Sequence, residues 1–135
     1  MIPGPQSCTI LVIDDEDMVR ALVTEILEED GHVVFGAAGG AEALTLLQAV
    51  VPDLILLDLL MPRMSGADVI QHLRADGATR RIPIVVMTSA SAAEANELNS
   101  AGVIGFIPKP FDPGEFSRLI AELIHVTKNR KRAEP

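Results

Sequence analysis

The chain has 135 residues, 48% of them apolar and 22% charged, with a net charge of −8 and one cysteine. This is the length of a single domain with a real core, and the lone cysteine excludes an internal disulfide. No apolar run approaches the roughly 18 to 20 residues of a membrane-spanning helix, and residues 1–7 lack the pattern of a secretion signal. We therefore expect a cytoplasmic protein that does not enter a membrane.

The charge is unevenly distributed. Residues 128–135 hold four of the 11 basic side chains and one of the 19 acidic ones, which leaves 7 basic and 18 acidic residues in the rest of the chain. Such an acidic body repels the phosphates of nucleic acids, so we expect no nucleic-acid partner. We predict one domain over residues 8–127, with flexible ends at residues 1–7 and at the basic residues 128–135.

Short apolar segments typical of β-strands alternate with segments of helical periodicity. In chain order, we predict a strand at Thr9–Ile13, a helix around Val19–Leu27, a strand at His32–Phe35, a helix at Ala41–Val50, a strand at Asp53–Leu57, a helix at Gly66–Ala75, a strand at Ile82–Met87, a helix at Ser91–Ser100, a strand at Val103–Ile107 and a helix around Phe116–Ile124. Gly31 lies where the end of the first helix would need a glycine.

Strands that alternate with helices indicate a parallel sheet. The continuous apolar run Leu54–Leu57 indicates a strand that is covered on both faces. We therefore predict an α/β fold, a three-layer sandwich with five helices and a five-stranded parallel sheet of order 2-1-3-4-5, the flavodoxin-like arrangement. The helix at Ser91–Ser100 offers mainly alanines for burial, so we expect it to be the most weakly held.

Polar residues follow the strands in a regular way. Asp14 and Asp15 end the first strand, Asp58 ends the third, Thr88 ends the fourth and Lys109 follows the fifth. In this sheet order the carboxyl ends of strands 1 and 3 flank the point where ligands bind. Each residue alone could be a helix cap or a surface residue, but together they predict a crevice in which clustered carboxylates attract a hard cation such as Mg²⁺. A carboxylate, a metal, a lysine and a hydroxyl are the groups needed to form an aspartyl phosphate.

Four segments carry a family resemblance: LVIDDED, LILLDLLMPRMSG, IVVMTSA and GFIPKPF. In this order and spacing they resemble the signature segments of response-regulator receiver domains of two-component signalling, over residues 8–127. The resemblance implies that Asp58 accepts a phosphoryl group from a phosphohistidine on a sensor histidine kinase or a histidine phosphotransfer protein. It also implies that Asp15 and Asp58 bind Mg²⁺ directly with the backbone carbonyl of Leu60, and that Asp14 acts through a water.

The resemblance further assigns a switching role. Lys109 would pair with the phosphoryl group, Thr88 would move toward it, and Phe106 would change rotamer as Thr88 moves. The surface formed by the helix at Ser91–Ser100, the fifth strand and the last helix would then bind or release an unknown downstream protein. The side chain of Leu60 is apolar where several relatives carry a polar residue, so the lifetime of the phosphoryl group does not follow from the resemblance.

As a signalling switch, the protein would not be an enzyme that acts on other substrates. Two other functions are possible alternatives. A Mg²⁺-dependent phosphohydrolase usually has an Asp-x-Asp motif after its first strand, whereas here Asp14 and Asp15 are adjacent. A receiver-like docking module that is never phosphorylated is disfavoured because all the acceptor-site residues are present. The chain could be a stand-alone regulator or one domain of a hybrid kinase, and both remain open.

Overall fold

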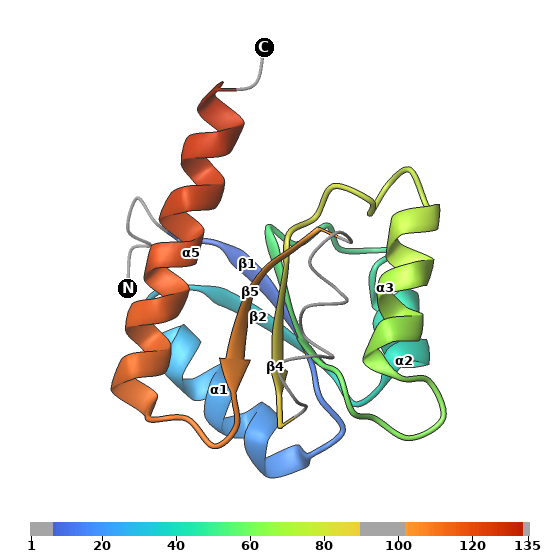
Figure 1. Ribbon diagram of the computed structural model, residues 1–135, viewed down its shortest axis with the longest axis horizontal. Helices are drawn as coiled ribbons and strands as arrows, with labels where there is room; N and C mark the ends of the chain where they lie inside the picture. Colours follow the sequence, from blue (N-terminus) through green and yellow to red (C-terminus); the bar gives the residue numbers. More distant parts are fainter. Residues whose placement is uncertain (1–6, 90–101, 134–135) are drawn as a thin grey trace.

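The computed structural model describes residues 7–89 and 102–133, with the side chains of the last helix described up to Asn129 (Figure 1). Nine elements follow one another in these ranges: β1 (Thr9–Ile13), α1 (Asp17–Glu29), β2 (Val33–Ala37), α2 (Gly40–Leu46), β3 (Leu54–Asp58), α3 (Gly66–Ala75), β4 (Ile84–Thr88), β5 (Val103–Pro108) and α5 (Pro113–Ala133). The helix predicted at Ser91–Ser100 lies outside the described residues.

The strands form one parallel sheet in the order β2-β1-β3-β4-β5, as predicted. Helices cover both of its faces, with α1 and α5 on one side and α2 and α3 on the other (Figure 1). The fold is therefore the predicted three-layer α/β sandwich of flavodoxin-like order.

Two apolar clusters, one on each face of the sheet, explain why the central strands read as continuous apolar runs. Alternate residues of β1 belong to different clusters: Leu11 and Ile13 pack on the α2–α3 side, and Ile10 and Val12 on the α1–α5 side. Every residue of β3 and β4 is buried. Because successive side chains of a strand point to opposite faces, a strand covered on both sides needs apolar residues at every position.

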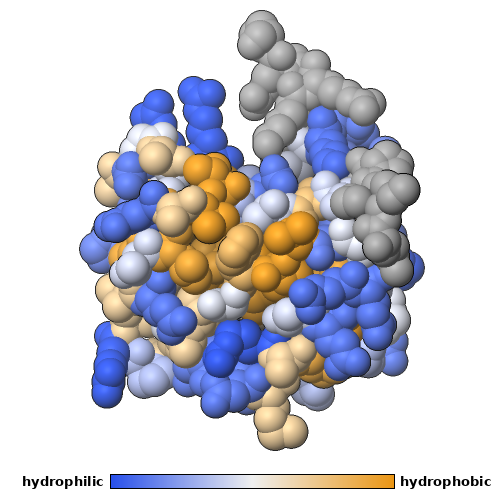
Figure 2. Space-filling view, turned by 180° about the vertical axis from the view of Figure 1, so that it is seen from behind, coloured by the Kyte–Doolittle hydropathy of each residue, from blue (hydrophilic) through white to orange (hydrophobic). Residues whose placement is uncertain are grey.

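The two edges of the sheet are less buried. The edge strand β2 leaves Val33 51% exposed. Figure 2, which shows the molecule from behind the view of Figure 1, has apolar side chains across the middle of that face and hydrophilic residues around them. At the other edge, β5 buries Val103 and Ile107 and leaves the three residues between them half-buried.

Two helices differ from the sequence-based expectation. Helix α2 ends at Leu46 rather than Val50, and Gln48 and Ala49 continue with tighter hydrogen bonds to carbonyls three residues back. Helix α5 extends to Ala133, so most of the basic segment that we expected to be a flexible tail is helical. Lysine and arginine are good helix formers, and they continue a helix whose first turns are anchored by the fully buried Phe116 and Ile120.

Candidate functional site

The register of β1 and β3 places two aspartates side by side. Ile13 pairs with Leu57, so Asp14 and Asp58 are the next residues of neighbouring strands at the carboxyl edge of the sheet. The backbone N–H of Asp14 donates to Ala37 O of β2 (3.1 Å), which holds the chain in line as β1 ends. Both aspartates are buried, with 0% and 3% of their surface exposed.

Lys109 reaches this pair from the far edge of the sheet. Its backbone N–H donates to Thr88 O (3.2 Å), which fixes the residue just beyond β5. Its Nζ lies 2.7 Å from Asp14 Oδ2 and 3.4 Å from Asp58 Oδ2. The loop that follows is anchored by Phe111, whose ring centroid lies 4.8 Å from that of the buried Phe116.

The pKa values of the two partners reflect this crowding. Burial raises the pKa of Asp58, the charge of Lys109 lowers it, and the charge of Asp14 raises it, with a net upward shift. Burial alone would lower the pKa of Lys109, but the hydrogen bond from its ammonium to Asp14 and the surrounding carboxylate charges raise it above its ordinary value. Lys109 therefore stays positively charged, and the ionised form of Asp58 is disfavoured relative to that of a solvated aspartate.

A third carboxylate, which we did not single out from the sequence, completes the group. One carboxylate oxygen each of Asp14, Glu16 and Asp58 lie within 4.8 Å of one another. Glu16 Oε1 also lies 3.2 Å from Lys109 Nζ. Asp15, predicted as a direct metal ligand, is exposed and is not part of this group. The only signal for Glu16 was its place in the acidic run DDED, which does not show which carboxylates turn inward.

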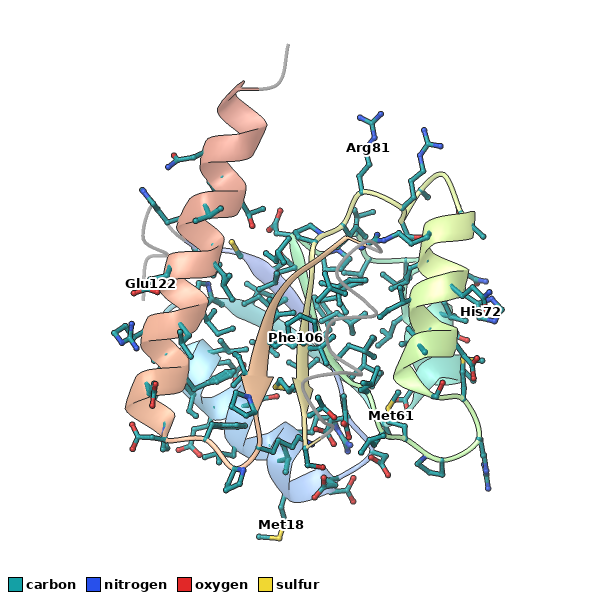
Figure 3. All side chains as sticks on the ribbon, in the orientation of Figure 1. Met18, Met61, His72, Arg81, Phe106 and Glu122 are labelled. Atoms are coloured by element: carbon teal, nitrogen blue, oxygen red, sulfur yellow. The ribbon has the colours of Figure 1, made fainter. Side chains whose placement is uncertain are left out.

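The remaining predicted residues border the site. Thr88 ends β4, is 5% exposed, and lies one position beyond Met87, the partner of Asp58 in the sheet. The Leu60 side chain is 54% exposed, and its backbone N–H donates to Asp58 Oδ1 (3.1 Å). Phe106 is half-buried in the middle of the view in Figure 3, packed against the core cluster on the α2–α3 side.

The loop after β3 is held close to Asp58 by the start of α3. Ser65 caps this helix by accepting a hydrogen bond from the Asp68 backbone, and the Asp68 side chain accepts one from the Ser65 N–H. The next residue, Gly66, approaches the strand so closely that a Cβ there would lie 2.6 Å from Leu59 Cα and 2.7 Å from Asp58 O. Within the same loop Met61 is buried (Figure 3), and Arg63 has a φ of 69°.

These observations define a class of protein: a doubly wound α/β domain with a cluster of carboxylates and an ion-paired lysine at its topological switch point. Comparison with known proteins agrees. The family model of the response regulator receiver domain matches residues 10–121. The chain therefore belongs to the response regulator receiver domain family and is a receiver domain of two-component signal transduction.

Similar proteins include regulators of several lineages. The chain is 36% identical to the response regulator MprA of Mycobacterium tuberculosis over 95% of its own length and 55% of that protein's. It is also 36% identical to the probable transcriptional regulator ycf27 of Cyanophora paradoxa, over 89% of its own length and 49% of that protein's. The chain thus spans about half the length of these curated relatives.

Among solved structures, the chemotaxis protein CheY4 of Vibrio cholerae has a TM-score of 0.81 and 29% identity, over 87% of this chain and 98% of that one. NtrX of Brucella abortus has a TM-score of 0.85 and 25% identity, over 94% of this chain and 29% of that one. Across the part of the chain that the structure describes, no helix has both the length and the apolar character needed to cross a membrane.

Proposed function

We propose that Asp58 is the phosphoacceptor of this receiver domain and takes a phosphoryl group from a phosphohistidine on a sensor histidine kinase or a histidine phosphotransfer protein. The observation that carries the proposal is the position of Asp58 at the end of β3, with two carboxylates within 4.8 Å and the Lys109 ammonium 3.4 Å from Oδ2. The response-regulator relatives support histidine kinases as the partners.

The step is a transfer between two nucleophiles. An oxygen of Asp58 attacks phosphorus as the phosphorus–nitrogen bond of the phosphohistidine breaks, and the electron pair of that bond remains on the imidazole nitrogen. Negative charge develops on the transferred group, and Lys109 is the fixed cation placed to stabilise it. Burial of Asp58 excludes water from the attacking oxygen and so favours transfer over solvation of the carboxylate.

The same residues fit a divalent metal ion. Three carboxylates within 4.8 Å and one lysine leave a local charge of −2, and carboxylate oxygens are the ligands that Mg²⁺ prefers. We propose that Asp58 and Asp15 would hold it directly, together with the backbone carbonyl of Leu60, and that Asp14 would act through a water. When bound, the ion supplies positive charge that offsets the repulsion between Asp58 and an incoming phosphoryl group.

We propose that phosphorylation of Asp58 is passed to a downstream protein through the two strands that carry Thr88 and Phe106. Thr88 and Phe106 lie on β4 and β5, which are neighbours in the sheet. Movement of Thr88 toward a phosphoryl group on Asp58 would free space for Phe106 to turn, and the face formed by β5 and α5 would change shape for a downstream protein.

Intact mass spectrometry tests the proposal directly. After incubation with a small acyl phosphate and Mg²⁺, the wild-type protein should gain the mass of one phosphoryl group. Chelation of the metal or the substitution Asp58→Asn should abolish the gain, and Glu122→Gln, on the exposed face of α5, should leave it unchanged. No gain from the acyl phosphate or from a phosphohistidine protein would refute the proposal and favour a docking module.

A further inference from the structure

The ammonium of Lys109 is shared unequally among three carboxylates. Its Nζ is 2.7 Å from Asp14, 3.2 Å from Glu16 and 3.4 Å from Asp58. The two nearest carboxylates belong to the β1–α1 segment, and the acceptor aspartate is the farthest. In this arrangement the ammonium lies nearer to the carboxylates of the β1–α1 segment than to that of Asp58.

Among the residues that the structure describes, Lys109 is the only hydrogen-bond or ion-pair partner of the Glu16 side chain. Glu16 is the residue before the first turn of α1, where a side chain usually accepts a hydrogen bond from the helix, but its side chain makes no such cap. That side chain is 60% exposed, so it does not pack in the core. Its backbone N–H donates to Asp14 Oδ1 (2.9 Å), which fixes the point from which the side chain reaches Lys109.

The position of Glu16 has two opposite consequences for phosphorylation. Its charge adds to the attraction of the carboxylate cluster for a divalent cation. Its contact with Lys109 competes with Asp58 for the ammonium, and its charge opposes the approach of an anionic phosphoryl donor. The first effect governs how much metal is needed, and the second governs the rate once the metal site is full.

We infer that Glu16 is a positioning residue that, together with Asp14, draws the Lys109 ammonium toward the β1–α1 segment and leaves its longest contact to Asp58. In the unphosphorylated domain Glu16 thereby slows phosphorylation while aiding metal binding. The inference rests on the proposed function, since it concerns the same acceptor. A contact that restrains the lysine keeps the unmodified protein from accepting phosphoryl groups readily from small donors.

Two Glu16 variants and one control separate the effect of the Glu16 charge from the effect of its contact with Lys109. Glu16→Gln removes the negative charge and leaves only a neutral amide oxygen, a much weaker acceptor for the ammonium. Glu16→Asp keeps the charge but shortens the side chain by one methylene, which breaks the reach to Lys109. Asp17→Asn is the matched control, because Asp17 is the next acidic residue, is 86% exposed and pairs with Arg20 instead of Lys109. Circular dichroism establishes that each variant is folded.

Metal affinity is measured first, by calorimetric titration with Mg²⁺ without any donor. Loss of one exposed charge a few ångström from a divalent ion should weaken binding in Glu16→Gln by about fivefold, with a much smaller change in Glu16→Asp. In the metal-free protein, the exchange of the Lys109 ammonium protons with water is followed by ¹⁵N NMR. The exchange rate should be higher in both Glu16 variants than in the wild type, and it should be the same in Asp17→Asn as in the wild type.

The phosphorylation rate is then measured by intact mass with an acyl phosphate at saturating Mg²⁺. Both Glu16 variants should react faster than wild type, by about two- to fivefold, because the competitor for the ammonium is neutral in Glu16→Gln and out of reach in Glu16→Asp. Equal rates for Glu16→Gln and Asp17→Asn, or a slower rate for the Glu16 variants, would overturn the inference alone. Failure of the wild type to gain any phosphoryl group would overturn the proposed function and this inference with it.

Discussion

Neutralising Asp58 should make the metal-free protein more stable. The carboxylate is buried, and its oxygens lie within 4.8 Å of those of Asp14 and Glu16. At that separation and an effective dielectric constant of 20, each repulsion is about 3.5 kcal/mol, and the attraction to Lys109 at 3.4 Å is about 5 kcal/mol. The two repulsions exceed the attraction, and screening of the exposed Glu16 reduces the excess, so Asp58→Asn should raise the free energy of unfolding by about 1 to 2 kcal/mol.

The effect has a defined pH dependence. The pKa of Asp58 is raised in the folded protein, so the folded state binds more protons than the unfolded state over the range between the two pKa values. Stability of the wild type therefore falls as pH rises from the ordinary value of 3.8 through the raised one. The advantage of Asp58→Asn should be absent below this range and complete above it.

Urea unfolding followed by far-ultraviolet circular dichroism measures the difference, because the chain has no tryptophan or tyrosine to report by fluorescence. Asp17→Asn, an exposed change of the same type, should alter the free energy of unfolding by less than about 0.5 kcal/mol. Millimolar Mg²⁺ should stabilise the wild type more than Asp58→Asn and reduce or reverse the difference. A metal-free Asp58→Asn protein less stable than wild type would refute the reasoning.

Three further predictions concern residues around the site and at the opposite end of the sheet. Gly66→Ala should lower the free energy of unfolding by about 2 to 4 kcal/mol in urea, because the new Cβ would lie 2.6 Å from Leu59 Cα. Arg63→Gly should raise it by about 1 kcal/mol, since a φ of 69° strains a residue with a Cβ; a loss of stability would contradict this. His32 accepts a hydrogen bond from the Cys8 N–H at Nδ1 and is held neutral, with its pKa lowered by burial. Stability should therefore decline as pH falls below the ordinary value of 6.5, and His32→Gln should remove this decline.

The sequence predicted the fold where one physical cause dominates. Burial on both faces makes β3 read as an uninterrupted apolar run, as predicted for Leu54–Leu57. Strand β1 was predicted with its observed bounds. Helix α3 was also predicted with its observed bounds, and in the structure Ser65 and Asp68 cap its start. The φ of 94° at Gly31 confirms that this glycine serves the end of α1.

The sequence predicted less where two causes compete. The basic residues 128–135 suggested a solvated tail, but helix propensity and the anchored first turns of α5 extend the helix to Ala133. In the site, the run DDED supplies several carboxylates, and the turn from β1 into α1 decides which of them point inward. It directs Asp14 and Glu16 to Lys109 and leaves Asp15 exposed. A pattern of residue types does not contain that turn geometry.

The sheet itself offers a physical route from Asp58, the proposed acceptor, to the β5 face. Val86 pairs with Phe106, and both belong to the core cluster on the α2–α3 side. Because side chains alternate along a strand, Thr88, two residues after Val86, points to that same side. A shift of Thr88 toward Asp58 would therefore remove a neighbour from the side of the sheet where Phe106 packs. Since Phe106 is only half-buried, it can respond by turning without opening a large cavity in the core.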